Sequence, residues 1–203
     1  MNTSHLPFSQ ACENNKTAIL ACIQAIFVNT QQVLEIGSGT GQHAVHFAQH
    51  LNQLCWQISD MSGCSRGCQQ RIYESRLNNI KPSITLDVGD SPWPIVENVY
   101  DGLFSANTLH IMPWSNVENL FREAAKTLRD KADLCFYGPF NYHGHYTSNS
   151  NAQFDQYLKQ QNPVSGIRDF EAILRCAEAA NMQLISDYAM PANNRLLHFQ
   201  LTL

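Results

Sequence analysis

A glycine-rich turn follows a short apolar run in the segment Val33-Leu-Glu-Ile-Gly-Ser-Gly-Thr-Gly41. Glycines let a backbone turn sharply and approach a ligand closely, and a helix that begins there offers free N–H groups to a negative group. The dinucleotide pattern G-x-G-x-x-G is not met because position 42 is Gln, and a Walker A loop is not met because no Lys follows Gly41. The remaining pattern is E-x-G-x-G-x-G, with Glu35 two places before the first glycine.

Polar residues follow each of the next three predicted strands. Asp60 ends the second strand, where a carboxylate can accept hydrogen bonds from both hydroxyls of a ribose. Asp87 ends the third strand and could meet the amino group of an adenine, and Asn107 follows the fourth. Because ligands of open α/β sheets bind at the carboxyl ends of the strands, these residues and the glycine turn are predicted to converge.

Candidates for acid–base or orienting chemistry lie farther along the chain. His110 stands three residues beyond Asn107, and the segment 137–146 carries Tyr142 and His143 among other aromatic residues. Their alternative roles are a packed or capping histidine and a lid that only excludes water. Asn15, with the neighbouring Lys16 near the start of the first helix, could close over a bound cofactor.

Histidines and cysteines are not expected to bind a metal. His43, His46 and His50 lie opposite the apolar stripe of their helix and are predicted to face solvent, and no further ligand completes a site. Cys64 and Cys68 form the one close pair among seven cysteines, with no second pair nearby. We expect free, reduced thiols, because the cysteine number is odd and no signal-peptide pattern follows Met1.

The elements that must position these residues alternate between helix-like and strand-like patterns. This alternation predicts one α/β domain over 1–203, with a doubly wound, mostly parallel seven-stranded sheet that ends in an antiparallel hairpin. A helical segment lies within 1–30, and a loop and helix on the substrate side are inserted over 138–165. The predicted strands are 32–36, 54–59, 83–86, 100–106, 132–137, 182–189 and 196–202. Helices are predicted over 13–27, after the glycine turn as far as Leu51, through Arg71 and Leu77, from the N-cap Ser115 through Leu128, and near 155–160 and 169–180.

Composition narrows the class of protein. The chain has 203 residues, 44% of them apolar and only 15% charged, which suits one domain with a full core and excludes a disordered tail or a coiled coil. A net charge of −4 disfavours a dedicated nucleic-acid binder. The longest mostly apolar stretch, 17–28, is too short to span a bilayer, so a soluble, cytoplasmic protein without a membrane partner is expected. Trp93, between two prolines, is expected to anchor a loop in the core.

The sequence resembles class I S-adenosylmethionine-dependent methyltransferases, whose cofactor motif matches residues 35–41. More narrowly it resembles the methyltransferase-like protein 26 family, while residues 61–81 depart most from that family's pattern. The matching stretches are 8–16, 33–47, 56–60, 106–114, 137–140, 148–151, 166–169 and 190–194.

This resemblance implies a Rossmann-like fold, S-adenosyl-L-methionine as cofactor, and roles for individual residues. Gly37, Gly39 and Gly41 would hold the methionine part, with Asn107 nearby. Asp60 would bind the ribose, Met61 would pack on the adenine, and Asp87 with the backbone of Val88 would bind the adenine edge. Glu35 would order the glycine turn or reach the cofactor's amino group through water.

The predicted activity is methyl transfer to an unidentified small molecule or protein side chain. A cofactor-binding protein without turnover, acting as a sensor or partner subunit, stays open. A nicotinamide-dependent oxidoreductase is disfavoured by Gln42 and by the carboxy-terminal hairpin. Nucleic-acid methylation is disfavoured by the acidic charge and because 107–110 lacks an Asn-Pro-Pro-Tyr-like run. The acceptor, the attacked atom and the oligomeric state are not determined at this level.

Overall fold

The computed structural model describes residues 6–203, so residues 1–5 of the predicted amino-terminal segment lie outside the described part. Its centre is a seven-stranded sheet with the order β3-β2-β1-β4-β5-β9-β8. All pairs from β3 to β5 are parallel, whereas β9 pairs antiparallel with both β5 and β8. The strands are β1 (Gln32–Ile36), β2 (Cys55–Asp60), β3 (Ile80–Thr85), β4 (Tyr100–Ala106), β5 (Leu128–Gly138), β8 (Met182–Met190) and β9 (Asn194–Leu201).

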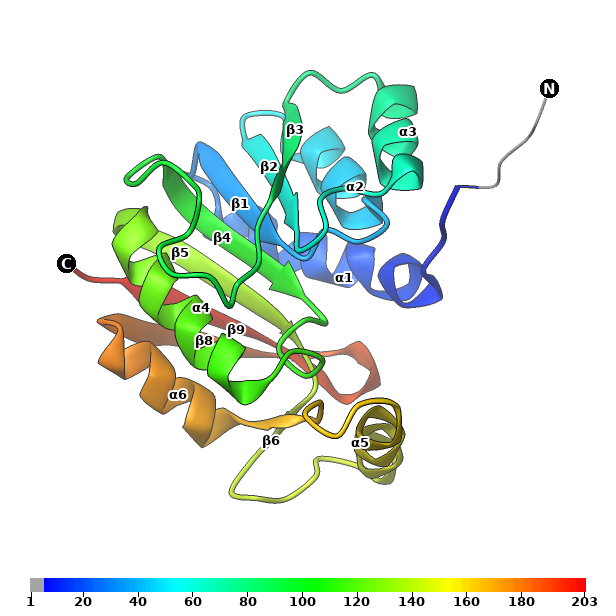
Figure 1. Ribbon diagram of the computed structural model, residues 1–203, viewed down its shortest axis with the longest axis vertical. Helices are drawn as coiled ribbons and strands as arrows, with labels where there is room; N and C mark the ends of the chain where they lie inside the picture. Colours follow the sequence, from blue (N-terminus) through cyan, green and yellow to red (C-terminus); the bar gives the residue numbers. More distant parts are fainter. Residues whose placement is uncertain (1–5) are drawn as a thin grey trace.

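Helices cover both faces of this sheet, as Figure 1 shows. Alternate residues of one strand face the two layers: Val33 packs with α1 and α2, while Leu34 packs with α4 and α6. The α5 helix lies beyond the end of the sheet toward which β4 runs (Figure 1). The helices are α1 (Gln10–Ile26), α2 (Gln42–His50), α3 (Arg66–Ser75), α4 (Trp114–Thr127), α5 (Asn149–Gln161) and α6 (Phe170–Ala179).

The predicted sheet is confirmed, including its antiparallel end. The bounds of β1 and β4 are as predicted, and Trp93 is buried. Other element boundaries differ from the prediction. The β3 and β5 strands begin three and four residues earlier than predicted, at Ile80 and Leu128. The N-cap of α4 is Pro113 and not Ser115, and α5 begins six residues earlier than 155 because the Ser148 side chain caps it.

One small feature had no counterpart in the prediction. The two-residue strands β6 (Phe140–Asn141) and β7 (Arg168–Asp169) pair in parallel and form a separate sheet. Strands this short carry no periodic pattern, since a period of two cannot be seen over two residues. They connect the start and the end of the inserted segment.

Two expectations about His and Cys residues are wrong. His43 is buried and does not face solvent, because α1 packs across the side of α2 that was expected to be open. Cys64 and Cys68 form a disulfide and are not unrelated thiols, since Ser65 caps α3 and places the two Cα atoms 5.8 Å apart across its first turn. Cys12, Cys22, Cys55, Cys135 and Cys176 are free. Over the described residues, no helix is long and apolar enough to cross a membrane.

Candidate functional site

The glycine turn between β1 and α2 has left-handed backbone angles at all three glycines. The φ values are +73° at Gly37, +53° at Gly39 and +73° at Gly41. A Cβ on Gly37 would lie 2.6 Å from Cγ2 of Thr108, whereas one on Gly39 would meet nothing closer than 4.0 Å. Gly37 is therefore required by packing, and the backbone around Gly39 stays open to a ligand.

The buried carboxylate of Glu35 contacts this turn. Its side chain is buried, and Oε2 accepts hydrogen bonds from the Ser38 hydroxyl at 2.8 Å and from the Trp56 indole N–H at 3.0 Å. Burial raises the pKa of Glu35 to about 7, against the lowering effect of these two hydrogen bonds. These contacts give Glu35 the loop-ordering role.

Asp60 fastens the turn to the end of β2. One carboxylate oxygen accepts from the Gly39 N–H at 2.9 Å, and the other accepts from the Met61 N–H at 2.8 Å. Each oxygen still has acceptor capacity, because an ionised carboxylate offers about four lone-pair positions. Met61 beside it is 65% exposed, so its apolar side chain is available to cover a flat ligand.

A cavity of about 320 Å³, named here the first cavity, lies directly next to this turn. It brings together four residues predicted to bind one ligand, Gly37, Asp60, Met61 and Asp87, along with Val88. The Val88 carbonyl already accepts from the Asn119 side chain at 2.6 Å, so Val88 offers a ligand its N–H. The other lining residues are Ile36, Leu86, Thr108, Ile111, Met112, Pro113, Asn116 and Asn162.

A cavity of about 570 Å³, named here the second cavity, lies on the other side of the segment after β4. Thr108 and Ile111 line the first cavity, whereas Asn107 and His110 line the second, so one short segment separates them. Asn107 has a φ of +59°, a conformation that asparagine tolerates. The second cavity is lined by Ser9, Ala11, Cys12, Asn14, Asn15, Ala106, Asn107, His110, Tyr137, Pro139, Ser150, Asn151, Phe154, Pro191, Ala192 and Asn194.

The pKa values of His110 and Tyr137, two titratable groups of that wall, are shifted by burial. Burial, helped by the charge of Arg168, lowers the pKa of His110 to about 4, so its imidazole is neutral at pH 7. Burial also raises the pKa of Tyr137, although hydrogen bonding with Asn15 and Asn194 opposes that shift. The wall therefore holds neutral, hydrogen-bonding groups at physiological pH.

The segment between the cavities is held by residues 165–168, at the end of the insertion 138–165 and directly after it. All four backbone carbonyls of residues 109–112 accept hydrogen bonds from these residues. The Arg168 guanidinium binds the first and the last at 3.0 and 2.5 Å, the Gly166 N–H binds the second at 2.8 Å, and the Ser165 hydroxyl binds the third at 2.9 Å. This contact fixes the insertion against the walls of both cavities.

Two predicted catalytic candidates lie elsewhere. The Tyr142 hydroxyl donates to Asp187 at 2.6 Å, and its ring stacks on Phe170. His143 is exposed and lies 3.2 Å from the Glu171 carboxylate. Neither lines the first or the second cavity.

Several wall residues of the second cavity were not singled out from the sequence. They are Tyr137, Asn151, Phe154 and Asn194. Three of them lie in stretches that carry the resemblance, namely 137–140, 148–151 and 190–194, and the segments 137–146 and 138–165 are already expected on the substrate side from the sequence. The sequence therefore marked these stretches, but no local pattern indicated that their side chains meet in one cavity.

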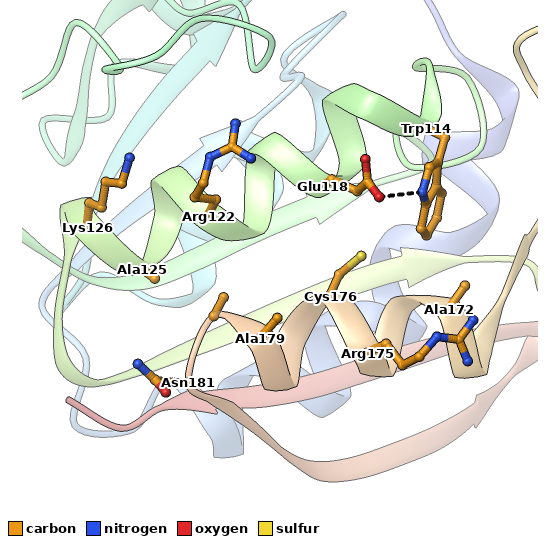
Figure 2. Close-up of a pocket in the computed structure, with 11 residues that line it drawn as sticks. Trp114, Glu118, Arg122, Ala125, Lys126, Ala172, Arg175, Cys176, Ala179 and Asn181 are labelled. Carbon is orange, nitrogen blue, oxygen red and sulfur yellow. Dashed lines mark hydrogen bonds between the residues drawn. The ribbon is translucent and has the colours of Figure 1, made fainter.

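A third hollow of about 850 Å³ lies between α4 and α6, away from the strand ends (Figure 2). The Trp114 indole N–H donates to Glu118 there at 2.9 Å, and Arg122, Lys126 and Arg175 line its sides. It contains none of the residues predicted to bind a ligand. Within residues 6–203, no group of three or more His, Cys, Asp or Glu residues could hold a metal ion.

The fold and the glycine turn define a class, the class I S-adenosylmethionine-dependent methyltransferase fold. An S-adenosylmethionine-dependent methyltransferase named SibL matches with a TM-score of 0.79 at 18% identity, over 95% of this chain and 56% of that one. An O-methyltransferase family protein from Burkholderia thailandensis matches with a TM-score of 0.80 at 14% identity, over 92% and 56%. PigF, solved with SAH, matches with a TM-score of 0.74 at 14% identity, over 91% and 61%.

The chain belongs to the family described as a protein of unknown function (DUF938), whose model matches residues 6–201. It spans little more than half the length of the solved structures it resembles.

Proposed function

We propose that the chain binds S-adenosylmethionine in the first cavity and transfers its methyl group to an acceptor in the second. The observation that carries this proposal is the Asp60 carboxylate, which joins the glycine turn to Met61 at the edge of the first cavity. A carboxylate held at that place keeps acceptor capacity for two ribose hydroxyls.

The residues of the first cavity fit the parts of this cofactor. Met61 would cover one face of the adenine, and Asp87 with the Val88 N–H would bind its edge. The open backbone around Gly39 would receive the methionine part, with Asn107 and Asn15 on the far side of the segment after β4. Glu35 would act through the turn that it orders.

When bound, the cofactor would supply a methyl group attached to a sulfonium sulfur. The acceptor takes the methyl group, and the sulfur is released as a neutral thioether. The chain's contribution is to hold an acceptor atom in line with that methyl, because positioning alone can be worth up to about 7–11 kcal/mol. The shared segment after β4 suits this task, since its residues line both cavities.

His110 is the candidate orienting group. Because its pKa is about 4, the ring can accept or donate a hydrogen bond at pH 7 but is a weak base there. Tyr142 and His143 would have to move to reach the second cavity, so the proposal assigns the orienting role to His110 alone. Kinship with methyltransferase-like protein 26 and a cytoplasmic location stay predictions.

The test is calorimetric titration with S-adenosylmethionine, S-adenosylhomocysteine and NAD. Binding of the first two without NAD supports the proposal, and NAD binding alone would support the oxidoreductase alternative. A protein that binds the cofactor and yet transfers no labelled methyl group to any component of a cell extract would instead fit the sensor or partner-subunit alternative. Absence of all binding would contradict the proposed function.

A further inference from the structure

The second cavity has a wall of neutral polar groups. Among the described residues that line it there is no Asp, Glu, Lys or Arg. Its polar side chains include five asparagines, which are Asn14, Asn15, Asn107, Asn151 and Asn194. An amide side chain can donate and accept hydrogen bonds, so the wall suits an uncharged ligand with both kinds of group.

The charged groups near this cavity are engaged elsewhere. Arg168 binds backbone carbonyls, and the buried Asp155 accepts from the Ile167 N–H, the Tyr146 hydroxyl and Lys159. Lys16 pairs with Glu13. A charged acceptor entering the cavity would lose hydration without gaining an ionic partner, which weakens its binding relative to an uncharged one.

The α1 side of the cavity presents a hydrogen-bond donor. The Asn15 Oδ1 lies 2.7 Å from Nε2 of the buried His43, and an amide oxygen can only accept. Since burial lowers the pKa of His43 to about 4, the ring is neutral and its single proton is on Nε2. This contact occupies the oxygen of Asn15 and leaves its NH₂ group for Tyr137 and the cavity.

The α5 side presents an acceptor. The Asn151 NH₂ donates to the Thr147 hydroxyl at 2.9 Å and to the Asn193 carbonyl at 3.1 Å. Both of its N–H groups are therefore used, and Oδ1 remains for a ligand. The donor of Asn15 and the acceptor of Asn151 come from two different helices that line the cavity, α1 and α5.

Flat rings complete the cavity. The rings of His110 and Phe154 meet edge to face with centroids 5.4 Å apart, and Tyr137 contributes a further ring. Aromatic rings pack against other flat rings by offset stacking or edge to face, so rings in the wall favour a planar guest. A volume of about 570 Å³ lies within the ordinary range of small-molecule sites, roughly 300–1,000 Å³.

We infer that the methyl acceptor is an uncharged, planar small molecule with both hydrogen-bond donors and acceptors, bound between the start of α1 and α5. That the ligand accepts a methyl group rests on the proposed function, whereas the preference for an uncharged ligand follows from the residues that line the cavity.

The test uses three ring ligands of matched size: meta-hydroxybenzamide, meta-hydroxybenzoate and meta-hydroxybenzylamine. Their dissociation constants are measured by ligand-observed NMR titration at pH 7 with saturating S-adenosylhomocysteine. The neutral amide is expected to bind about tenfold or more tighter than either ion, a difference of about 1.4 kcal/mol. Equal or tighter binding of an ion, or no binding of any of the three below about 10 mM, overturns the inference.

A matched pair of variants places the binding site. Ser150 lines the second cavity near the start of α5, whereas its neighbour Asn149 is exposed and does not line it. Acidic residues suit both positions because they lie in the first turn of a helix. Ser150→Asp is expected to tighten binding of the cation about threefold and to weaken binding of the anion, while Asn149→Asp leaves all three constants within about twofold. If Ser150→Asp changes nothing, the ring ligands bind elsewhere and the inference is wrong.

Failure of the proposed function is recognised separately. Binding of S-adenosylhomocysteine is measured on the same protein before the ring ligands are added. If that binding is absent, the proposed function fails. The order of the dissociation constants of the three ring ligands, measured without S-adenosylhomocysteine, then still tests the preference of the cavity for an uncharged ligand.

Discussion

The two cavities at the end of the sheet obtain their polar groups in different ways. In the first cavity, carboxylates and backbone N–H groups come directly from the ends of β1, β2 and β3. In the second, neutral amides come from α1, the segment after β4, α5 and the first residue of β9. The difference shows that one sheet edge can hold an anionic, backbone-built site beside an uncharged, side-chain-built one.

One short chain segment, residues 109–112, lies between the two cavities and connects them structurally. Within residues 109–112, Ile111 and Met112 line the first cavity and His110 lines the second, and four hydrogen bonds from residues 165–168 hold the carbonyls of this segment. The insertion that forms the α5 wall of the second cavity is thereby fixed to the first. The predictions below test whether the cavities are separable and where they are coupled.

Asp60→Ala is expected to have the largest effect. Loss of the carboxylate removes the proposed ribose partner and leaves the N–H groups of Gly39 and Met61 without an acceptor, so S-adenosylmethionine affinity should fall about 100-fold or more in calorimetry. Asp101→Ala is the matched control, because Asp101 also accepts from two backbone N–H groups, those of Gln31 and Gln32, but lines neither cavity. Similar affinity losses in both variants would mean that Asp60 acts only on stability.

Gly37→Ala should destabilise the protein by about 2–3 kcal/mol in chemical denaturation. The new Cβ would lie 2.6 Å from Cγ2 of Thr108, at a φ of +73° that alanine disfavours. Adding Thr108→Ser removes that methyl group and keeps the hydroxyl contact with Ser105, so the double variant should recover about half of the loss. Absence of any recovery would contradict the packing between the turn and the segment after β4.

Glu35→Gln tests the buried charge beneath the first cavity. The pKa of Glu35 is raised from its ordinary 4.5 to about 7, so the folded state binds more protons than the unfolded state in that window, and stability falls as pH rises through it. Glutamine can still accept from Ser38 and Trp56 but does not ionise. Between pH 5 and pH 8 the variant should therefore gain about 2–3 kcal/mol of unfolding free energy relative to the parent protein.

The buried histidines His43 and His110 are common to both proteins and cancel in that difference. On their own they act in the opposite direction. Since their folded pKa values are lowered to about 4 from 6.5, they cost stability as pH falls through that interval. An unchanged pH dependence in Glu35→Gln would contradict the assignment of a raised pKa to Glu35.

Arg168→Lys should have the smallest effect on affinity, but it should affect both cavities. A lysine cannot bind the carbonyls of Leu109 and Met112 together, since it lacks the planar fork of the guanidinium. Affinity for both S-adenosylmethionine and the neutral ring ligand should weaken about three- to tenfold. Arg175→Lys, in the hollow between α4 and α6, serves as the control. Weaker binding at one cavity alone would contradict the prediction that residue 168 couples the two cavities.

Local pattern predicted most of the sheet and most of the first cavity. The bounds of β1 and β4 follow from short apolar runs, and the glycine spacing, Asp60 and Asp87 each follow a strand directly in the chain. Parallel strands bring their carboxyl ends to one edge, so their ends predict neighbours without a structure. Positions in the second cavity come from segments more than a hundred residues apart, such as Asn15 and Asn194.

The sequence by itself determined the order of the main elements and the fold class, because these depend on periodicity. It also predicted which residues at the strand ends meet in the first cavity, because those residues stand next to the strands in the chain. Only the tertiary structure decided that His43 is buried beneath α1, that Cys64 pairs with Cys68, and that Tyr142 turns to Asp187 and away from the cavities. It also decided that residues 165–168 bind the segment after β4. The physical reason is that such contacts depend on how helices and inserted loops pack against one another, and side-chain contacts between distant segments leave no period in the chain.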